Sequence, residues 1–235
     1  MSRERAVADL ADLQGGLVVS CQAREDNPLH GPFFMAAMAR AAVQGGAVGI
    51  RADGVADIAA IREAVGPDMP IMGIFKVKQP DGSLFITPSA ETARAVIAAG
   101  ARLVALDGTL RPRPGGEALA DVVAAIHAAG GAALADIGTV DNARYVVSCG
   151  VDAVGTTLSG YTPDSPKLDG PDFALLAQLT RELALPVFAE GRIWTREEAR
   201  QALDLGASFV VVGTAITNPT AITARFAAAL ANEAD

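Results

Sequence analysis

The sequence contains few of the residues that build disulfide frameworks or metal sites. Its 235 residues include two cysteines, Cys21 and Cys149, and two histidines, His30 and His127. Two cysteines in or beside apolar segments are too few for a disulfide framework, so both are expected to be thiols in a reducing cytoplasm. The histidines lie far apart and lack cysteine or carboxylate neighbours at ligand spacing, so no metal site is predicted.

Long apolar runs and basic clusters are also missing. The longest apolar runs are strand-sized and interrupted by glycine or charge, which argues against a transmembrane segment. The first ten residues alternate charged and apolar side chains and lack the apolar core of a signal peptide. Residues 1–14 are expected to form a short helix that leads into the first strand.

The charge balance points away from nucleic acid. The net charge is −8, and no run of Lys or Arg exceeds two residues, whereas nucleic-acid surfaces need basic clusters to neutralise phosphates. The sequence also has no Gly-x-Ser-x-Gly elbow, Walker loop or CxxC pair, so no cofactor is predicted. A small anionic substrate remains possible for an acidic protein, because a phosphate site is built locally from backbone N–H groups and one or two cations.

Eight short apolar runs alternate with Ala-rich helical stretches along the whole chain. Runs that are apolar at consecutive positions are typical of parallel strands covered on both faces. Eight such units can close into a barrel or form an open doubly wound sheet; the count, and the lack of GxGxxG after the first strand, favour an α/β fold of the (β/α)8 TIM-barrel type. No linker or composition shift marks a second domain, so residues 1–235 are predicted to be one domain. The predicted strands are Gly16–Gln22, Ala47–Ala52, Pro70–Lys76, Leu103–Gly108, Ala132–Ile137, Ala153–Leu158, Pro186–Gly191 and Phe209–Ile216.

Polar side chains follow six of these apolar strand cores. In a parallel barrel all strand ends converge on one mouth, where enzymes of this fold place their active sites. Structural roles are open for most of them: Gln22 can bond a loop, Arg51 can pair with Asp136 or Glu190, and Asp107 and Asp136 can cap loops or hold cations. The six candidates are Gln22, Arg51, Lys76, Asp107, Asp136 and Glu190.

Lys76 is the hardest of the six to explain structurally. It ends an otherwise apolar strand, and burying an ammonium is costly unless the charge is paired. A lysine near Glu190 across the mouth is a candidate acid/base pair. Lys78, two residues later, is expected in a solvated loop.

Glycine-containing turns follow the last two strands. Gly191-Arg192 comes after strand seven and Gly213-Thr214 after strand eight. Barrels often bind phosphate at these turns through backbone N–H groups and the N-terminus of a short extra helix, which the segment 217–220 can begin. Tight turns without a ligand are the alternative.

With these strand ends, the chain resembles the N-acetylmannosamine-6-phosphate 2-epimerases of bacterial sialic acid breakdown. The resemblance runs from about Leu13 to Phe226, and its most specific strings are Leu110-Arg-Pro-Arg-Pro114 and Gly155-Thr-Thr-Leu-Ser-Gly-Tyr-Thr162. Further matching segments are Gly15–Ala23, Gly45–Ala52, Gly73–Lys76, Ala135–Ile137, Ala189–Ile193 and Val211–Thr217. The loop at 77–83 departs from the family pattern, and Gly108 stands where the family has Ala.

The resemblance implies an isomerase that interconverts N-acetyl-D-mannosamine 6-phosphate and N-acetyl-D-glucosamine 6-phosphate. It implies that Lys76 transfers the proton with Glu190 as its acidic partner. The sugar and its N-acetyl group would be held by Asp136, Arg51 and Gln22, with Asp107 as a further candidate contact. The 6-phosphate would be held by Gly191, Arg192, Gly213 and Thr214.

This chemistry suits the residues. C2 of the ring-opened sugar lies next to a carbonyl, so a base can remove its proton and hydrogen-bond donors can stabilise the enolate, with neither metal nor nicotinamide. Two mechanisms stay open: one base acts on an intermediate that rotates, or Lys76 and Glu190 act on opposite faces of C2. Two other functions also stay open. One is another phosphate-binding barrel enzyme, of histidine, tryptophan or thiazole pathways, and the other is a non-catalytic sugar-phosphate sensor. A homodimer through outer helices is expected by analogy with barrels of this size.

Overall fold

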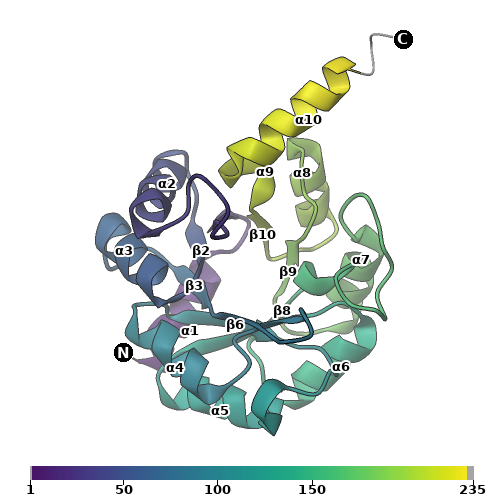
Figure 1. The fold of residues 1–235 in the computed structure, drawn as a ribbon. Coiled ribbons are helices and arrows are strands. Elements are labelled where there is room, and N and C mark those ends of the chain that lie inside the picture. Colours follow the sequence, from purple (N-terminus) through teal and green to yellow (C-terminus); the bar gives the residue numbers. More distant parts are fainter. Residues whose placement is uncertain (1, 232–235) are drawn as a thin grey trace.

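The computed structural model describes residues 2–231, and these include a closed barrel of eight parallel strands surrounded by helices (Figure 1). Around the barrel the strands follow the order β1-β10-β9-β8-β7-β6-β3-β2. The predicted barrel is therefore confirmed, and the open doubly wound sheet is excluded. The barrel strands are β1 (Leu17–Cys21), β2 (Gly49–Asp53), β3 (Ile71–Ile74), β6 (Leu103–Asp107), β7 (Ala132–Asp136), β8 (Ala153–Gly155), β9 (Val187–Glu190) and β10 (Phe209–Val212).

Helices cover the outside of the barrel between successive strands. Local capping fixes where several of them begin. Thr195 caps the last of the series: its Oγ1 accepts from the Glu198 N–H at 3.0 Å, and the Glu198 carboxylate accepts from the Thr195 N–H at 3.0 Å, which together form a capping box. The covering helices are α2 (Pro32–Gln44), α3 (Val55–Val65), α4 (Ala90–Ala98), α5 (Leu119–Ala128), α6 (Val140–Ser148), α7 (Phe173–Glu182) and α8 (Arg196–Asp204).

The barrel interior is filled by side chains below the mouth. Phe188 and Phe209 stack inside it with ring centroids 5.0 Å apart. Gly155 on the neighbouring strand makes room for them, because a Cβ at this position would lie 2.0 Å from the Phe188 ring. The segment 1–14, where a helix is predicted, contains α1 (Arg3–Asp12), whose Ala6 packs into the same interior cluster. The interior is thus a packed floor under the strand C-terminal ends.

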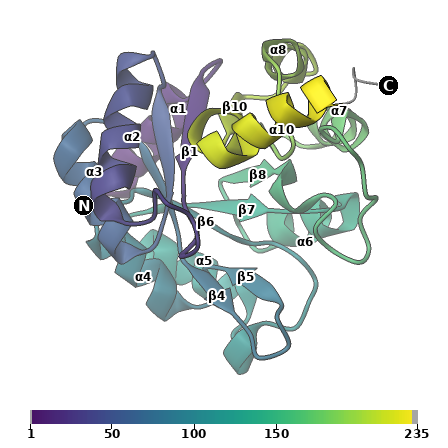
Figure 2. The same cartoon turned by 45° about the horizontal axis from the view of Figure 1, so that its top comes forward.

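The chain leaves the barrel after β3 in a way that the sequence analysis missed. The predicted strand Pro70–Lys76 ends at Ile74, and the chain then forms an antiparallel hairpin of β4 (Lys76–Lys78) and β5 (Leu84–Ile86), which projects from the barrel in Figure 2. Its turn is closed by the Gln79 N–H, which donates to the Ser83 carbonyl at 2.8 Å. Lys76 therefore does not end a buried strand, and its side chain is 34% exposed.

Two other predicted strands end early. The segment Ala153–Leu158 becomes β8 followed by a single 3-10 turn, η2 (Thr156–Leu158). After β10 the short helix α9 (Thr214–Thr217) begins at once, three residues before the short helix that the sequence predicts. The helix that does begin near that position is α10 (Pro219–Ala231), since a proline suits the first turn of a helix.

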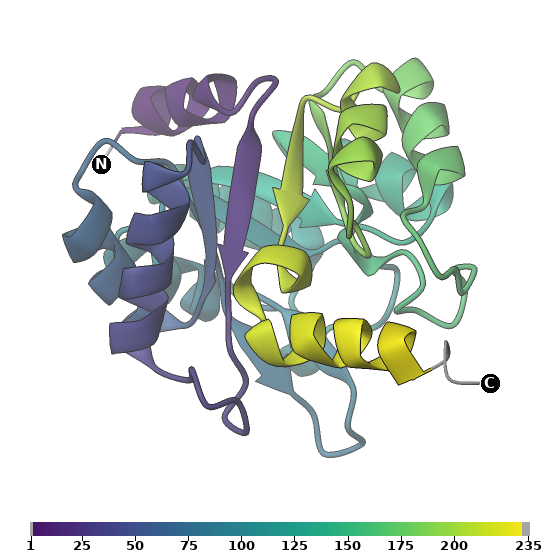
Figure 3. The ribbon, with the colours of Figure 1, turned by 90° about the horizontal axis from the view of Figure 1, so that it is seen from above.

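The last helix, α10, projects away from the barrel past α9 (Figures 1 and 3). None of its residues is buried, and Phe226 and Leu230 are each 71% exposed. Arg225 of this helix packs its guanidinium over Trp194, 4.5 Å from the centre of the ring. Within residues 2–231, no helix is both long and apolar enough to cross a membrane.

Candidate active site

A buried arginine joins two carboxylates at the centre of the barrel mouth. Arg51, on β2, donates to Asp136 through Nη1 at 3.1 Å and Nη2 at 2.6 Å. The same Nη1 lies 2.9 Å from Oε2 of Glu190. The Arg51 side chain is 1% exposed, and those of Asp136 and Glu190 are 0% and 14% exposed. Arg51 therefore fills the structural role that the sequence left open, with both partners at once.

The electrostatics of this group leave Glu190 able to change its charge near neutral pH. Burial, with a further contribution from Asp136, raises the pKa of Glu190 to about 7, although Arg51 and Lys76 act in the opposite direction. Burial alone would lower the pKa of Arg51, but Asp136 and Glu190 raise it above its ordinary value, so Arg51 stays charged. A carboxyl group with a pKa near the working pH suits proton transfer.

Two threonines of the η2 turn hydrogen-bond to Asp136 and Glu190. Thr157 Oγ1 donates to Asp136 Oδ1 at 2.6 Å and lies 3.2 Å from Oε2 of Glu190. Thr156 Oγ1 donates to the main-chain carbonyl of Glu190 at 2.9 Å. The pair occupies the end of the sixth predicted strand, so its position at the mouth was readable from the sequence, although its role was not.

Lys76 lies at the mouth with partners of its own. Its Nζ donates to Oε1 of Gln22 and lies 3.5 Å from Oδ2 of Asp53. The Asp53 carboxylate also accepts from the main-chain N–H of Lys76 at 3.0 Å, so one side chain holds both the backbone and the ammonium. Gln22 is fixed in turn by Ser20, to whose hydroxyl it donates at 2.7 Å. These contacts fix the position of the lysine, although its side chain is 34% exposed.

Asp53 is a site residue that was not predicted. On this strand the prediction stopped at Arg51, because one polar residue was taken from each strand end. Residues two apart on a strand point to the same face, so Asp53 shares the inward face with Arg51. The alternation of the strand could have identified it.

Lys76 and Glu190 approach the same mouth from different groups. Lys76 contacts Gln22 and Asp53, whereas Glu190 contacts Arg51 and Thr157. Lys76 is near enough to lower the pKa of Glu190, as the smallest of the contributions to it. Among the described residues, Lys76 and Glu190 therefore lie at one mouth without an ion pair to each other.

Asp107 is occupied by its own loop. Its Oδ1 accepts from the main-chain N–H of Thr109 at 3.0 Å and from the Thr109 hydroxyl at 2.6 Å, and its Oδ2 accepts from Arg111 at 2.6 Å. Arg111 also stacks over Phe85, 4.3 Å from the ring centre, and donates to the carbonyl of Leu84 at 3.2 Å. Asp107 therefore caps its own loop, which is the structural alternative that the sequence left open. Through Arg111, Asp107 also connects the Lys76 hairpin to the loop after β6.

The four residues of the predicted phosphate side lie together at the ends of β9 and β10, which pair in the sheet. Gly191 and Arg192 both have left-handed backbone, with φ of +114° and +56°. The Arg192 guanidinium turns away to donate to the carbonyls of Gly170 at 2.7 Å and Ser159 at 2.5 Å. What this side offers an anion is therefore main-chain N–H groups, together with the start of α9, rather than the Arg192 side chain.

The described part of the chain shows no cluster of three or more His, Cys, Asp or Glu side chains that could hold a metal ion. The site thus consists of a lysine, a carboxyl group of raised pKa, a fixed Arg–Asp pair and glycine turns at one barrel mouth. A barrel mouth with such groups is typical of enzymes that act on small molecules by acid/base chemistry.

Comparison with known proteins gives the family. The family model described as "Putative N-acetylmannosamine-6-phosphate epimerase" matches residues 35–232. Two similar proteins named as 2-epimerases for N-acetylmannosamine 6-phosphate come from Clostridium perfringens (48% identical, covering 91% of this chain and 96% of that one) and Clostridioides difficile (44% identical, covering 94% and 98%). The chain belongs to the N-acetylmannosamine-6-phosphate epimerase family, and the resemblance seen in the sequence is confirmed.

A solved structure of the Clostridium perfringens N-acetylmannosamine-6-phosphate 2-epimerase matches with a TM-score of 0.90 at 47% identity, covering 94% of this chain and 95% of that one. A thiamine phosphate pyrophosphorylase from Pyrococcus furiosus matches with a TM-score of 0.61 but only 18% identity, covering 91% of each chain. The second likeness shows the barrel fold alone.

Proposed function

We propose that this chain is a single-domain epimerase that interconverts N-acetyl-D-mannosamine 6-phosphate and N-acetyl-D-glucosamine 6-phosphate. The family it belongs to supports this substrate pair. The observation that carries the proposal is the placement of Lys76 and Glu190 at one mouth in separate networks, with the pKa of Glu190 raised to about 7. Glu190 can then gain or lose a proton without first breaking a pair with Lys76.

The reaction proceeds through the open-chain aldehyde. Lys76, in its neutral form, takes the C2 proton, and the electron pair of the C–H bond moves toward C1 to form an enolate. A proton then returns to the opposite face of C2, which restores the aldehyde with inverted configuration. If Glu190 delivers that proton the mechanism has two bases, and if Lys76 returns it to a rotated intermediate the mechanism has one.

The remaining groups orient the sugar. Asp136 and Arg51 form a rigid pair in the floor of the mouth, and Gln22 extends from β1 beside the lysine. We assign the hydroxyl and N-acetyl groups of the sugar to these three residues. The 6-phosphate is assigned to main-chain N–H groups of Gly191, Arg192, Gly213 and Thr214. Asp107 does not contact the sugar in this assignment and acts indirectly, by holding the loop after β6 through Arg111.

Deuterium exchange tests the function directly. In heavy water, either 2-epimer incubated with the native chain should gain deuterium at C2 and give the other epimer, as followed by proton NMR. Lys76→Met should abolish both, with the folded state intact by circular dichroism. Lys78→Met is the matched control, since Lys78 is an exposed lysine two residues along the same strand, and it should behave as the native chain does. The absence of exchange with the native chain would overturn the proposal.

We also propose a homodimer in which α10 packs on a second copy. This helix has no buried residue, and Phe226 and Leu230 are each 71% exposed, so their apolar side chains are free to pack on a second copy. Sedimentation velocity should give a dimer for the native chain and a monomer for Phe226→Asp. Leu110→Asp, at an exposed leucine of the loop after β6, should stay dimeric. A native monomer would overturn this assignment.

We infer that the enzyme acts in the cytoplasm, in the breakdown of amino sugars. Cys21 and Cys149 are both free thiols, and burial raises the pKa of Cys21 to about 12, so this thiol is unreactive. Fractionation of the source cells, with activity recovered in the cytoplasmic fraction, would support the location.

A further inference from the structure

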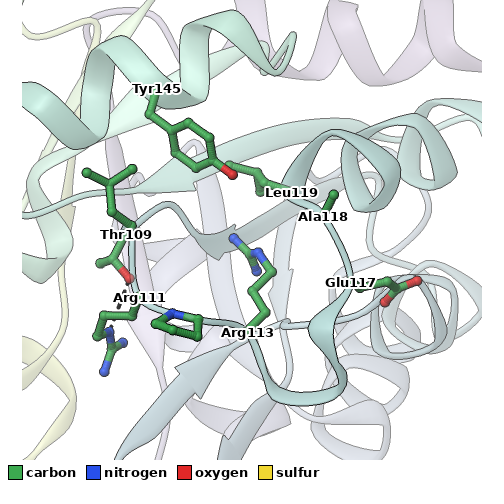
Figure 4. A pocket seen from close by; sticks show the side chains of 9 residues that line it. Thr109, Arg111, Arg113, Glu117, Ala118, Leu119 and Tyr145 are labelled. Carbon is green, nitrogen blue, oxygen red and sulfur yellow. Dashed lines mark hydrogen bonds between the residues drawn. The ribbon is translucent and has the colours of Figure 1, made fainter.

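A cavity lies beside the barrel mouth, between the loop after β6 and helix α6 (Figure 4). Its volume is about 280 Å³, just below the range of sites for whole drug-sized ligands, so it suits a small molecule or one group of a larger one. Arg113 and Tyr145 line it, with Leu119 as an apolar wall. None of the residues assigned to the epimerase reaction lines this cavity.

The cavity contains a cation without a counter-ion. Nη2 of Arg113 donates to the main-chain carbonyl of Asp107, whereas Nη1 is buried and has no hydrogen-bond partner. Among the ion pairs of residues 2–231 there is none that involves Arg113. Burial lowers the pKa of Arg113, and the charge of Asp107 only partly opposes this. A desolvated charge without a partner is costly, and an anion in the cavity would remove the cost.

The neighbouring charged groups do not fill this role. Glu117 turns its carboxylate toward α4, where it accepts from the main-chain N–H of Ala90 at 2.9 Å. Arg111 is held by Asp107 and Phe85. Arg113 is thus the cation that the cavity presents.

A second donor comes from the opposite wall. Figure 4 shows Tyr145 reaching from α6 with its hydroxyl toward the Arg113 guanidinium. A guanidinium and a phenol hydroxyl that converge are both donors, and together they suit the oxygens of an anion.

We propose that this cavity is an accessory anion site, distinct from the 6-phosphate side of the mouth, which binds the phosphomonoester or carboxylate group of a small metabolite. Arg113 supplies the charge and Tyr145 supplies the second hydrogen bond. The site is served by β6 and α6, whereas the 6-phosphate side is built after β9 and β10.

The two tyrosines of the chain allow a direct test. Tyr145 reports on the cavity, and Tyr161 lies near Arg192, whose guanidinium is 5.6 Å from its ring centre. Fluorine NMR of protein labelled with 3-fluorotyrosine, titrated with inorganic phosphate at an ionic strength held constant with chloride, follows both signals. The Tyr145 signal should shift and saturate in the native chain and in Arg144→Ala, which removes an exposed arginine of the same helix.

The variants separate the outcomes. Arg113→Ala should abolish the saturable shift, and Arg113→Lys, which keeps the charge, should retain it at lower affinity, so a loss caused by a collapsed loop would be recognised. Lys76→Met should leave the shift unchanged even though it abolishes epimerisation, so the two proposals fail separately. Acetate in place of phosphate identifies which oxyanion the site prefers. A Tyr145 signal that does not respond to either anion, or that responds equally in Arg113→Ala, would overturn the proposal.

Discussion

Removal of Arg51 should show how strongly the floor of the mouth depends on one charge. Arg51→Met keeps most of the side-chain volume but leaves Asp136 and Glu190 without the guanidinium that lies 2.6 to 3.1 Å from their oxygens. Breaking a buried ion pair on one side costs about 3–5 kcal/mol, because the remaining charges are buried without a partner. We expect a loss of this size in the free energy of unfolding at pH 8.

The pH dependence gives this prediction its sharper form. Arg51 lowers the pKa of Glu190, which burial nevertheless raises to about 7, so Arg51→Met should raise that pKa further. A carboxyl group whose pKa is higher in the folded state stabilises the fold below its unfolded-state pKa, and this contribution is lost as the pH rises through the folded-state value. The loss in free energy of unfolding caused by Arg51→Met should therefore be smaller at pH 5 than at pH 8.

Urea unfolding at the two pH values measures the effect. Arg144→Met is the control, because Arg144 is 62% exposed and its pairs with Asp141 and Glu182 should contribute about 0–1 kcal/mol. The double variant Arg51→Met/Glu190→Gln should recover part of the loss at pH 8. A loss below about 1 kcal/mol for Arg51→Met, or an equal loss at both pH values, would refute the reasoning.

Three further outcomes are expected. Asp53→Asn removes the partly exposed ion pair with Lys76, worth at most about 1 kcal/mol, so kcat/KM should fall about fivefold or less with an unchanged Tm; a larger fall would mean that Asp53 does more than orient the lysine. Gly155→Ala puts a Cβ 2.0 Å from the phenylalanine ring beneath it and should cost about 1–3 kcal/mol in thermal unfolding, whereas Gly170→Ala, whose nearest neighbour is 3.7 Å away, should cost much less. The pH profile of kcat/KM should bend near pH 7 if Glu190 transfers a proton, and Thr157→Val, which removes a hydrogen bond that lowers its pKa, should move the bend upward; a profile that is flat from pH 5 to 9 would contradict this.

The barrel and its mouth could be predicted because they depend on periodic features. Eight apolar runs separated by helical stretches are enough to count strands, and the residue after each run is enough to find the mouth. Gln22, Arg51, Asp136 and Glu190 were found in this way, and the structure brings all four to one site.

The hairpin could not be recognised by the same means. Its strands are three residues each, too short for a period to be measured, and a single residue, Phe75, separates β3 from β4. The apolar run from Ile71 to Phe75 therefore reads as one strand that ends in Lys76. The exposure of the lysine follows from this break in the strand.

The partners of the ion pairs were the other feature that could not be predicted from the sequence. The sequence places Arg51, Asp136 and Glu190 at one mouth, but which carboxylate an arginine meets depends on distances of a few ångströms across the barrel. Strand registers such as Ser20 with Arg51 and Asp107 with Asp136 decide these distances, and they are set by long-range pairing. The direction of the Arg192 guanidinium, toward Gly170 and Ser159, is beyond the sequence for the same reason.

The hairpin that carries Lys76 has a consequence for how the activity can be lost. Its strands hydrogen-bond to each other, and neither belongs to the barrel ladder. It is held to the mouth by Asp53 at its base, by Arg111, which contacts Leu84 and Phe85, and by Ile86, which is buried in the interior cluster. Such a segment can open on its own while the barrel stays folded. Inactivation on warming should therefore precede global unfolding, with the first cleavage by a protease falling at the hairpin turn near Gly82.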